Sequence, residues 1–574
     1  MTAFGVWAPA AGRLEVEVRG GRTPMVPDGD RGWHRAEVDG VGPGDDYRFV
    51  VDGDALPDPR SPWQPDGVHG PSRLVDHGAF AWTDHGWGGV HLPSAVLYEL
   101  HVGTFSAAGT FDGLTERLDH LVDLGVDAVE LMPVNEFPGR RGWGYDGVDL
   151  FAPHHAYGGP DGLKRLVDAC HRRGLGVVLD VVYNHLGPAG NYLSRFGPYF
   201  TDRYRTPWGE AVNLDGPGSE EVRAFVVDNA LMWLRDYHLD GLRLDAVHGL
   251  VDTSATHVLE QLHVAVERLG AALGRPLFLI AESDLNDPRV VRRPEVGGYG
   301  VDAQWSDDLH HALHAVLTGE RSGYYSDFGS MADVASALRQ GFVYGGRYSA
   351  HRGRPHGRVD PALPGWRLLG YLQTHDQVGN RARGERIGAL ASPGRLKVGA
   401  ALVLTSPFVP MLFAGEEWAA STPFPYFTDH EDPELADAVR QGRRAEFASF
   451  GWDPQDIPDP QDPETFAAAR LDWDELRGEP HASILDWYRR LIDLRRRTPA
   501  LRDGRLDAVV TRHDDAARWL VVERGPVTVA ANIGWAEARV EAVGDLVLAS
   551  DPAVEARHDG TVALPPDTVA VVCR

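Results

Sequence analysis

Carboxylates follow four apolar segments that are predicted to be β-strands, and each carboxylate has a histidine, arginine or asparagine close by. The stretches that carry the carboxylates, one at the end of each apolar segment, are Asp180 to His185, Arg243 to His248, Ala281 to Asp284 and His375 to Gln377. In an α/β barrel the carboxyl ends of the strands meet on one face, which is where such barrels carry out chemistry. Any one acid could instead cap a loop or pair with an arginine. Like charges that converge in one cleft are costly unless they are paired or used, so four at matching positions indicate an active site.

Paired carboxylates beside aromatic residues favour glycoside hydrolysis, in which one acid attacks and another protonates the leaving oxygen. Asp245 stands two residues after Arg243, whose guanidinium is expected to keep it ionised, as a nucleophile requires. Glu282 directly follows the apolar run 277–281. Partial desolvation there is expected to raise its pKa toward the working range of a general acid. Asp376 remains as an anion that can support an oxocarbenium-like transition state.

Eight short apolar runs alternate with amphipathic stretches and are predicted to position these acids. The predicted strands are Val96–Leu100, Ala128–Met132, Val177–Val182, Gly241–Leu244, Leu277–Ala281, Val301–Gln304, Leu368–Gln373 and Met411–Phe413. Helices are predicted between most of them, at Gly113–Leu124, Leu163–Arg173, Ser219–Tyr237 and Thr256–Leu273 among others. This alternation predicts an α/β fold of the (β/α)₈ TIM-barrel type. No Gly-x-Gly-x-x-Gly motif follows the first strand, which disfavours an open dinucleotide-binding sheet.

Two β-rich regions flank the predicted barrel. The predicted domains are an N-terminal β-sandwich over 1–90, a catalytic barrel with loop insertions over 91–500 and a C-terminal β-sheet domain over 501–574. The supporting strands are Leu14–Val18, Trp33–Val38 and Tyr47–Val51 before the barrel, and Ala508–Val510, Trp519–Glu523, Thr528–Asn532 and Thr568–Val572 after the last helix, Ile484–Arg497. Pro57–Pro65 is predicted to be an extended connector laid over the surface. The Asp- and Pro-rich stretch 454–463 is predicted to be a surface loop.

Composition excludes several classes of partner. The chain has 574 residues with 56 Lys and Arg against 83 Asp and Glu, a net charge of −27. Such a field repels phosphate backbones and anionic lipid, so neither nucleic acid nor a membrane surface is expected as a partner. Two cysteines are too few for a disulfide framework, which favours a reducing compartment. No apolar run reaches the ~18 residues of a membrane span, and no signal peptide is recognised, so a cytoplasmic protein, monomeric in solution, is expected.

The four carboxylate segments resemble, in the same order, the four signature regions of the α-amylase family of glycoside hydrolases. The resemblance implies that Asp245 is the nucleophile, Glu282 the acid/base and Asp376 the transition-state stabiliser. It also implies that the side chains of His185, Arg243 and His375 contact the reacting glucose. Gly144-Tyr145-Asp146 matches a segment of that family whose tyrosine stacks beneath the same sugar.

Longer stretches resemble the members of that family that release trehalose from maltooligosyltrehalose. They are Tyr98–Phe105, Asn184–Tyr192, Arg243–His248, Gln304–His311, Gly319–Tyr325, His375–Asn380 and Thr422–His430. The first of these is shared with branching enzymes. The resemblance implies a retaining hydrolase that cuts the α-1,4 bond next to the terminal trehalose unit, that acts after a maltooligosyltrehalose synthase and that needs no redox or metal cofactor.

The predicted substrate-binding residues come from the same segments. They are Tyr145, Asp146, His185, Arg243, Leu244, Ala246, Val247, His248, Gln304, Trp305, Ser306, Asp307, Asp308, His375, Gln377, Val378, Gly379 and Asn380. A polar run with one tryptophan at the end of the sixth strand, 304–308, can supply stacking and hydrogen bonds to hydroxyls. The arginine-rich stretch 380–386 could reject the wrong disaccharide through polar groups left unpaired, or could be solvated surface.

Three further interpretations stay open or are set aside. A glycogen branching enzyme would share the acids but pass the glycosyl group to another sugar, and a non-catalytic glucan-binding protein would not need them intact. His154-His155, and His310 with His314 at helical spacing, could bind a metal. No flanking Cys or Glu completes a ligand set in the sequence, so no metal is predicted at either place.

Overall fold

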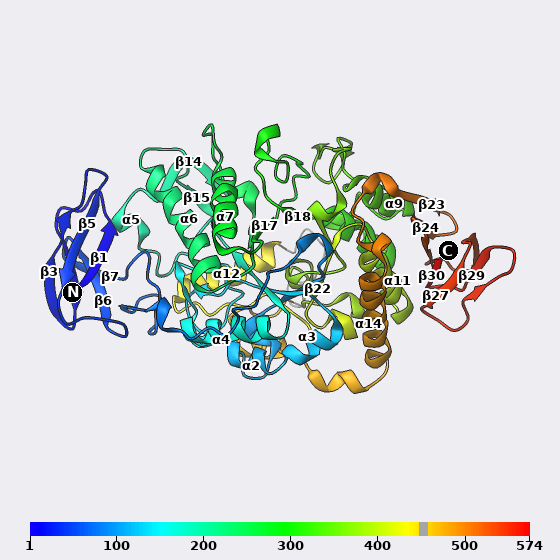
Figure 1. Cartoon of the computed structure of the whole chain (residues 1–574), viewed down its shortest axis with the longest axis horizontal. Coiled ribbons are helices and arrows are strands. Elements are labelled where there is room, and N and C mark those ends of the chain that lie inside the picture. The colour runs from blue at the N-terminus through cyan, green and yellow to red at the C-terminus, as the bar shows by residue number, and fades with distance from the viewer. Residues whose placement is uncertain (447–456) are drawn as a thin grey trace.

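The computed structural model describes residues 1–446 and 457–574. Three sheet-containing regions follow one another along the long axis of the molecule (Figure 1). The N-terminal sheets lie at one end, a closed barrel with its helices lies in the middle, and the C-terminal sheets lie at the other end. Among the described residues, no helix combines the length and the apolar character needed to cross a bilayer.

The middle region is a closed barrel of eight parallel strands, which confirms the predicted fold class. Its strands are β9 (Leu97–Leu100), β10 (Ala128–Leu131), β13 (Gly176–Val181), β16 (Gly241–Leu244), β17 (Phe278–Ala281), β18 (Ala303–Trp305), β21 (Leu368–Tyr371) and β22 (Val409–Phe413). Every residue in these strands is buried. Strands covered on both faces are read from sequence as continuous apolar runs, which is why all eight could be predicted within a few residues.

Helices connect most of the strands and surround them. The main ones are α3 (Leu118–Leu124), α4 (Gly159–Arg172), α6 (Ser219–Asp236), α7 (Val258–Leu273), α8 (Asp307–Thr318), α9 (Met331–Gln340), α11 (Pro393–Leu404), α12 (Pro433–Glu446) and α14 (His481–Arg497). The predicted helix Gly113–Leu124 is divided into α2 (Phe111–Thr115) and α3. Between α2 and α3 the backbone hydrogen bonds span three residues instead of four, which makes the turns tighter. The Arg117 N–H donates to the Leu114 carbonyl, and the Arg117 carbonyl accepts from the His120 N–H.

The N-terminal strands form two sheets. One contains β1 (Thr2–Trp7), β5 (Trp33–Val38) and β4 (Val26–Pro27), and the other contains β3 (Gly21–Pro24), β2 (Leu14–Val18), β6 (Asp46–Val51), β7 (Asp54–Leu56) and β8 (Ser72–Arg73). The region packs on the barrel domain through Trp7, whose ring centroid lies 5.2 Å from that of Tyr199. Trp33 Nε1 also donates to Glu221 of α6 at 2.9 Å.

The segment Pro57–Pro65 does not lie over the surface as predicted. Several of its residues are buried, and Asp58 is 8% exposed and accepts a hydrogen bond from Tyr47 Oη at 2.7 Å. The reason is that β8 returns to pair with β6, so the connector is enclosed between the N-terminal sheets and the barrel instead of passing outside them.

The C-terminal region is antiparallel. A five-stranded sheet contains β23 (Val509–Asp514), β24 (Trp519–Arg524), β25 (Val527–Asn532), β30 (Thr568–Cys573) and β27 (Asp545–Ala549), and a three-stranded sheet contains β26 (Ala538–Glu541), β29 (Thr561–Leu564) and β28 (Glu555–Ala556). Strands are therefore present at all four predicted places. The predicted loop 454–463 falls partly outside the described residues; over 457–462 the chain has no helix or strand, and α13 (Pro463–Ala468) begins at its end.

Candidate active site

Arg243 joins three of the predicted acids at the carboxyl ends of β13, β16 and β17. The side chain is fully buried, and its Nη1 lies 2.8 Å from Asp180 Oδ2 and 2.8 Å from Asp245 Oδ1. Its Nη2 lies 3.8 Å from Glu282 Oε2. Nη1 donates directly to Asp245, so a fixed positive charge lies in hydrogen-bond contact with that carboxylate. The geometry thus brings Asp180, Asp245 and Glu282 together around one guanidinium at this face of the barrel.

Glu282 is held by the backbone just after β16, the strand next to the one that Glu282 follows. The Ala246 N–H donates to Glu282 Oε2 at 2.6 Å, and Ala246 has a left-handed φ of 38°. A non-glycine residue in that region is strained, and strain of this kind gathers at functional sites. Burial raises the pKa of Glu282 well above its ordinary value, and the Asp245 and Asp376 carboxylates add to this increase while Arg243 opposes it.

Asp376 lies beside a charged histidine. His375 Nε2 is 3.5 Å from Asp376 Oδ1, and its Nδ1 is 2.5 Å from Glu99 of β9. Burial alone lowers the pKa of His375, but the carboxylates of Glu99 and Asp376 outweigh burial and raise it to about 9. The imidazolium therefore persists at neutral pH. Tyr145 lies against the same ring, with its Oη 2.8 Å from His375 Nε2 and 2.7 Å from Asp180.

Solvent exposure separates the predicted binding residues into two groups. Those that keep part of their surface open are Tyr145, Asp146, His185, His248, Asp307, Gln377 and Asn380, together with the three catalytic candidates. Those that are buried are Arg243, Leu244, Ala246, Val247, Gln304, Trp305, Ser306, Asp308, His375, Val378 and Gly379. The second group supports the first: Arg243, whose guanidinium carbon is 4.3 Å from the Trp305 ring centroid, donates a hydrogen bond to the partly open Asp245.

Asp307 and Asp308 are neighbours in sequence but have different surroundings. Asp307 is half-buried and accepts a hydrogen bond from Tyr371 Oη at 2.6 Å, and burial raises its pKa to about 7. Asp308 turns away and accepts from the backbone N–H groups of Val343 and Tyr344, each at 2.7 Å. The geometry therefore disagrees with the prediction for Asp308, because successive side chains at a helix start point in different directions.

An aromatic residue that sequence analysis did not identify lies at the same site. Trp208, in the turn between β14 (Phe200–Thr206) and β15 (Gly209–Val212), stacks on His185 with centroids 4.9 Å apart and planes 5° apart. The indole is 44% exposed, which is high for a tryptophan. Its only sequence signal was its place in a polar hairpin, where no core position explains a large apolar side chain.

Comparison with known proteins gives the chain its family. A family model for the catalytic domain of alpha-amylase matches residues 79–205, and one for a domain of unknown function, DUF3459, matches 504–571. A malto-oligosyltrehalose trehalohydrolase of Mycobacterium tuberculosis (strain H37Rv) is 52% identical, covering 96% of this chain and 95% of that protein. One from Rhizobium sp. (strain M-11) is 50% identical over 99% and 97% of the two chains. This chain belongs to the malto-oligosyltrehalose trehalohydrolase family.

Solved structures agree with the fold of this trehalohydrolase-family chain. A Salmonella typhimurium protein provisionally assigned as an alpha amylase superimposes with a TM-score of 0.92 at 38% identity, covering 100% of this chain and 97% of that one. A pullulanase from Anoxybacillus sp. LM18-11, solved with maltotetraose, gives a TM-score of 0.73 at 18% identity over 100% and 86%. The second likeness extends to the fold alone.

Two arginines of the stretch 380–386 have structural partners. Arg381 forms a two-point ion pair with Glu320, with contacts of 2.7 and 2.9 Å. Arg386 is 4% exposed and donates to the carbonyls of Thr422 and Ala414. In this member of the trehalohydrolase family these two side chains hold loops together, which favours the structural interpretation of the stretch for both.

Glu136 completes a cluster that the sequence did not reveal. Possible ligand atoms of Glu136, His154 and His155 all lie within 4.8 Å of one another, although Glu136 is far from the pair in sequence. His155 Nδ1 is 2.7 Å from Glu136 Oε1. His154 Nδ1 accepts a hydrogen bond from the Ala156 N–H, which leaves the proton of a neutral ring on Nε2. That tautomer presents a donor, not a lone pair, so the cluster fits a metal poorly.

Proposed function

We propose that the chain is a retaining glycoside hydrolase that cuts the α-1,4-glucosidic bond next to the terminal trehalose unit of maltooligosyltrehalose. The products are trehalose and a maltooligosaccharide. The observation that carries the proposal is the pair of carboxylates, Asp245 and Glu282, held around Arg243 in a chain at least half identical to trehalohydrolases over nearly its whole length. A glycogen branching enzyme is less well supported, because a 1,4-alpha-glucan branching enzyme of Pseudoalteromonas atlantica matches 55% of this chain at 34% identity.

The proposed reaction has two steps. In the first, Asp245 attacks the anomeric carbon of the last maltosyl glucose while Glu282 gives its proton to the departing oxygen of trehalose. The result is a glycosyl ester on Asp245. In the second, the Glu282 carboxylate takes a proton from water, which attacks the same carbon and frees the maltooligosaccharide with its configuration retained.

The neighbouring residues support these roles. Arg243 donates a hydrogen bond to the Asp245 carboxylate and orients it for attack, whereas the Glu282 carboxyl accepts a backbone N–H and has a raised pKa, which suits a proton donor. Asp376 stabilises positive charge that develops on the sugar ring. Tyr145, His185 and Trp208 surround the position of the reacting glucose and its neighbours.

The substrate implies a preceding reaction. An enzyme that converts the terminal α-1,4 linkage of a maltooligosaccharide into an α,α-1,1 linkage, a maltooligosyltrehalose synthase, must supply it. We further propose that the chain acts in the cytoplasm as a monomer and that its three predicted domains divide near residues 90 and 500.

Two variants with two substrates test the roles. Asp245→Ala is expected to lower kcat for maltotriosyltrehalose by about 10⁴-fold or more, and Glu282→Gln by about 10²–10⁴-fold. With α-maltotriosyl fluoride, whose leaving group needs no proton, Glu282→Gln should recover formation of the glycosyl ester and Asp245→Ala should not. Equal activity of the two variants on the fluoride would contradict the assignment. New α-1,6 branches from the unmodified enzyme would favour the branching enzyme.

A further inference from the structure

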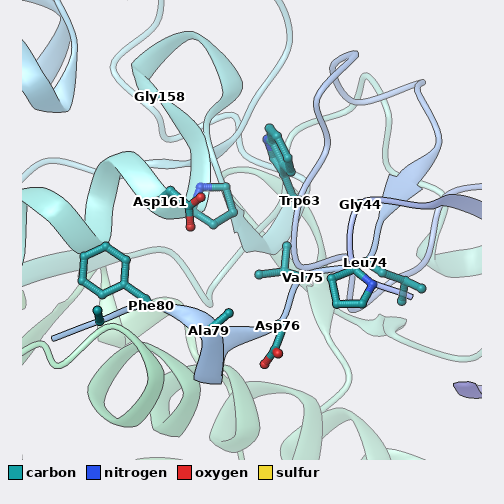
Figure 2. Close-up of a pocket in the computed structure, with 12 residues that line it drawn as sticks. Gly44, Trp63, Leu74, Val75, Asp76, Ala79, Phe80, Gly158 and Asp161 are labelled. Carbon is teal, nitrogen blue, oxygen red and sulfur yellow. The ribbon is translucent and has the colours of Figure 1, made fainter. Parts of the chain in front are cut away.

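A cavity of about 480 Å³ lies where the connector after the N-terminal sheets meets the start of α4 (Figure 2). Small-molecule sites have volumes of about 300–1,000 Å³. The connector supplies Trp63 and the segment 74–81, and the barrel region supplies Gly158, Pro160 and Asp161. None of these residues belongs to the active site described above, so the cavity is a separate place on the molecule.

Two aromatic side chains line the cavity. Trp63 and Phe80 come from separate parts of the connector and stand at two sides of the pocket in Figure 2. Both are half-buried. The Arg73 guanidinium, 5.1 Å from the Trp63 centroid, covers part of that ring without itself lining the cavity. Trp82 packs edge-on against Phe80 with centroids 4.8 Å apart. The two rings are thus fixed by neighbours while still facing the pocket.

Two carboxylates face the same space. Asp76 and Asp161 are exposed, and within the part of the chain that the structure describes the side chain of Asp161 makes no hydrogen bond. Asp76 Oδ1 accepts from the Gly78 N–H at 2.9 Å, and no described residue donates a hydrogen bond to its Oδ2. No lysine, arginine or histidine is among the residues that line the cavity. Arg73 lies over Trp63 and Lys164 Nζ is 5.9 Å from the Phe80 ring centroid, so the preference for a neutral, hydroxyl-bearing ligand rests on the two carboxylates that line the space.

Aromatic faces combined with hydrogen-bond acceptors suit one class of neutral ligand. A glucose ring presents C–H groups on its faces, which pack on aromatic rings, and pairs of hydroxyls at its edge, which donate to carboxylates. The cavity also lies toward the end of the barrel that carries the catalytic acids. Helix α4 runs back along the barrel after β10, so its first residues, Gly158 to Asp161, belong to the carboxyl end of the strands.

We propose that this cavity is a second α-glucan-binding site, which holds one or two glucose units of a maltooligosaccharide chain against Trp63 and Phe80. The choice of an α-glucan as ligand rests on the proposed function, because the substrate is a chain of such units. The site would retain long chains near the cleft without contacting the bond that is cut.

Affinity electrophoresis in gels that contain soluble starch tests the proposal, with Glu282→Gln as the background so that the polymer is not consumed. Adding Trp63→Ala is expected to raise the dissociation constant for starch by about tenfold, as truncation of a buried aromatic anchor does. Asp161→Asn, at an exposed position, should raise it less. With Glu282 intact, both variants should keep the KM and kcat of the parent for maltotriosyltrehalose, whereas Trp208→Ala should change the KM.

Several outcomes would overturn the proposal. If both Trp63→Ala and Asp161→Asn are retarded by starch as strongly as the parent, the site is excluded. If Trp63→Ala does not fold, unchanged retardation of Asp161→Asn and of Phe80→Leu excludes the site in the same way. If Trp63→Ala loses binding of tetramethylammonium but is still retarded by starch like the parent, the cavity binds a cation instead of an α-glucan. These results are independent of trehalose release, so a failure of the proposed function would show separately, as absent cleavage of maltotriosyltrehalose by the unmodified enzyme.

Discussion

Arg243 gives the acids around it unequal surroundings. It donates directly to Asp245 at 2.8 Å but approaches Glu282 only to 3.8 Å, while an amide N–H, which carries no net charge, donates to Glu282. Two carboxyl groups of one cleft thereby have different surroundings, and burial together with nearby carboxylates raises the pKa of Glu282, which is the property that an acid role requires. The raised pKa of Glu282 comes first from burial, and burial of an acid has a consequence for stability.

Glu282→Gln is expected to stabilise the fold at pH 7. Burial raises the pKa of Glu282 above its ordinary value of 4.5, so the folded chain holds this proton to a higher pH than the unfolded chain does. The Glu282 carboxyl therefore lowers the free energy of unfolding, and this loss grows as the pH rises from about 4.5 to the raised pKa. Thermal unfolding should show a higher Tm for Glu282→Gln at pH 7, with a difference that shrinks toward pH 4.

The exposed Glu295→Gln is the matched control and should leave Tm unchanged at every pH. A Glu282→Gln variant that is less stable than the parent at pH 7 would mean that the carboxylate is ionised and paired in the folded chain.

At the scale of elements, the sequence predicted strands better than it predicted the parts between them. The barrel strands are buried on both faces, so each left a continuous apolar run, and the acids could be located at their ends. The β14–β15 hairpin has mostly half-buried or exposed residues and left no such pattern. Trp208 was missed for this reason, and the burial of 57–65 was missed because Pro-rich segments have the same sequence pattern on a surface and inside an interface.

Trp208→Ala should weaken substrate binding more than it slows chemistry. The indole stacks on His185 and remains 44% exposed, so a sugar ring can pack on it beside the reacting glucose. Truncation is expected to lower kcat/KM for maltotriosyltrehalose by about tenfold, mostly through KM, and Trp208→Phe should recover part of the loss.

Trp535→Ala provides the comparison, because that tryptophan is 79% exposed in the C-terminal region. If Trp208→Ala has the same kinetics as the parent and as Trp535→Ala, the hairpin does not take part in the cleft.

At the scale of the whole molecule, buried arginines fasten the C-terminal sheets to the barrel. Arg524 of β24 is 4% exposed and its Nη1 donates to the carbonyls of Thr405, Ser406 and Leu501, at 2.7, 2.6 and 3.1 Å. Arg495 of α14 donates to the same end of α11. Among the residues that the structure describes, no carboxylate contacts either guanidinium, so the carbonyls that accept their hydrogen bonds are needed to stabilise these buried charges.

Arg524→Ala is expected to destabilise the protein by about 3 kcal/mol or more, because it leaves buried carbonyls without donors. Differential scanning calorimetry should show a lower Tm, with the catalytic constants unchanged at temperatures where the variant is folded. Arg505→Ala is the control, since that side chain is 71% exposed and forms an ion pair with nearby Asp503. An equal, small loss in both variants would show that the C-terminal sheets are not fastened in this way.

The most direct test of the proposed reaction is a proton NMR time course of maltotriosyltrehalose with the unmodified enzyme. If Asp245 attacks and Glu282 protonates as proposed, trehalose and the α-anomer of maltotriose should appear first and in equal amounts, before mutarotation produces the β-anomer. First appearance of β-maltotriose, or release of glucose or maltose in place of trehalose, would contradict the account.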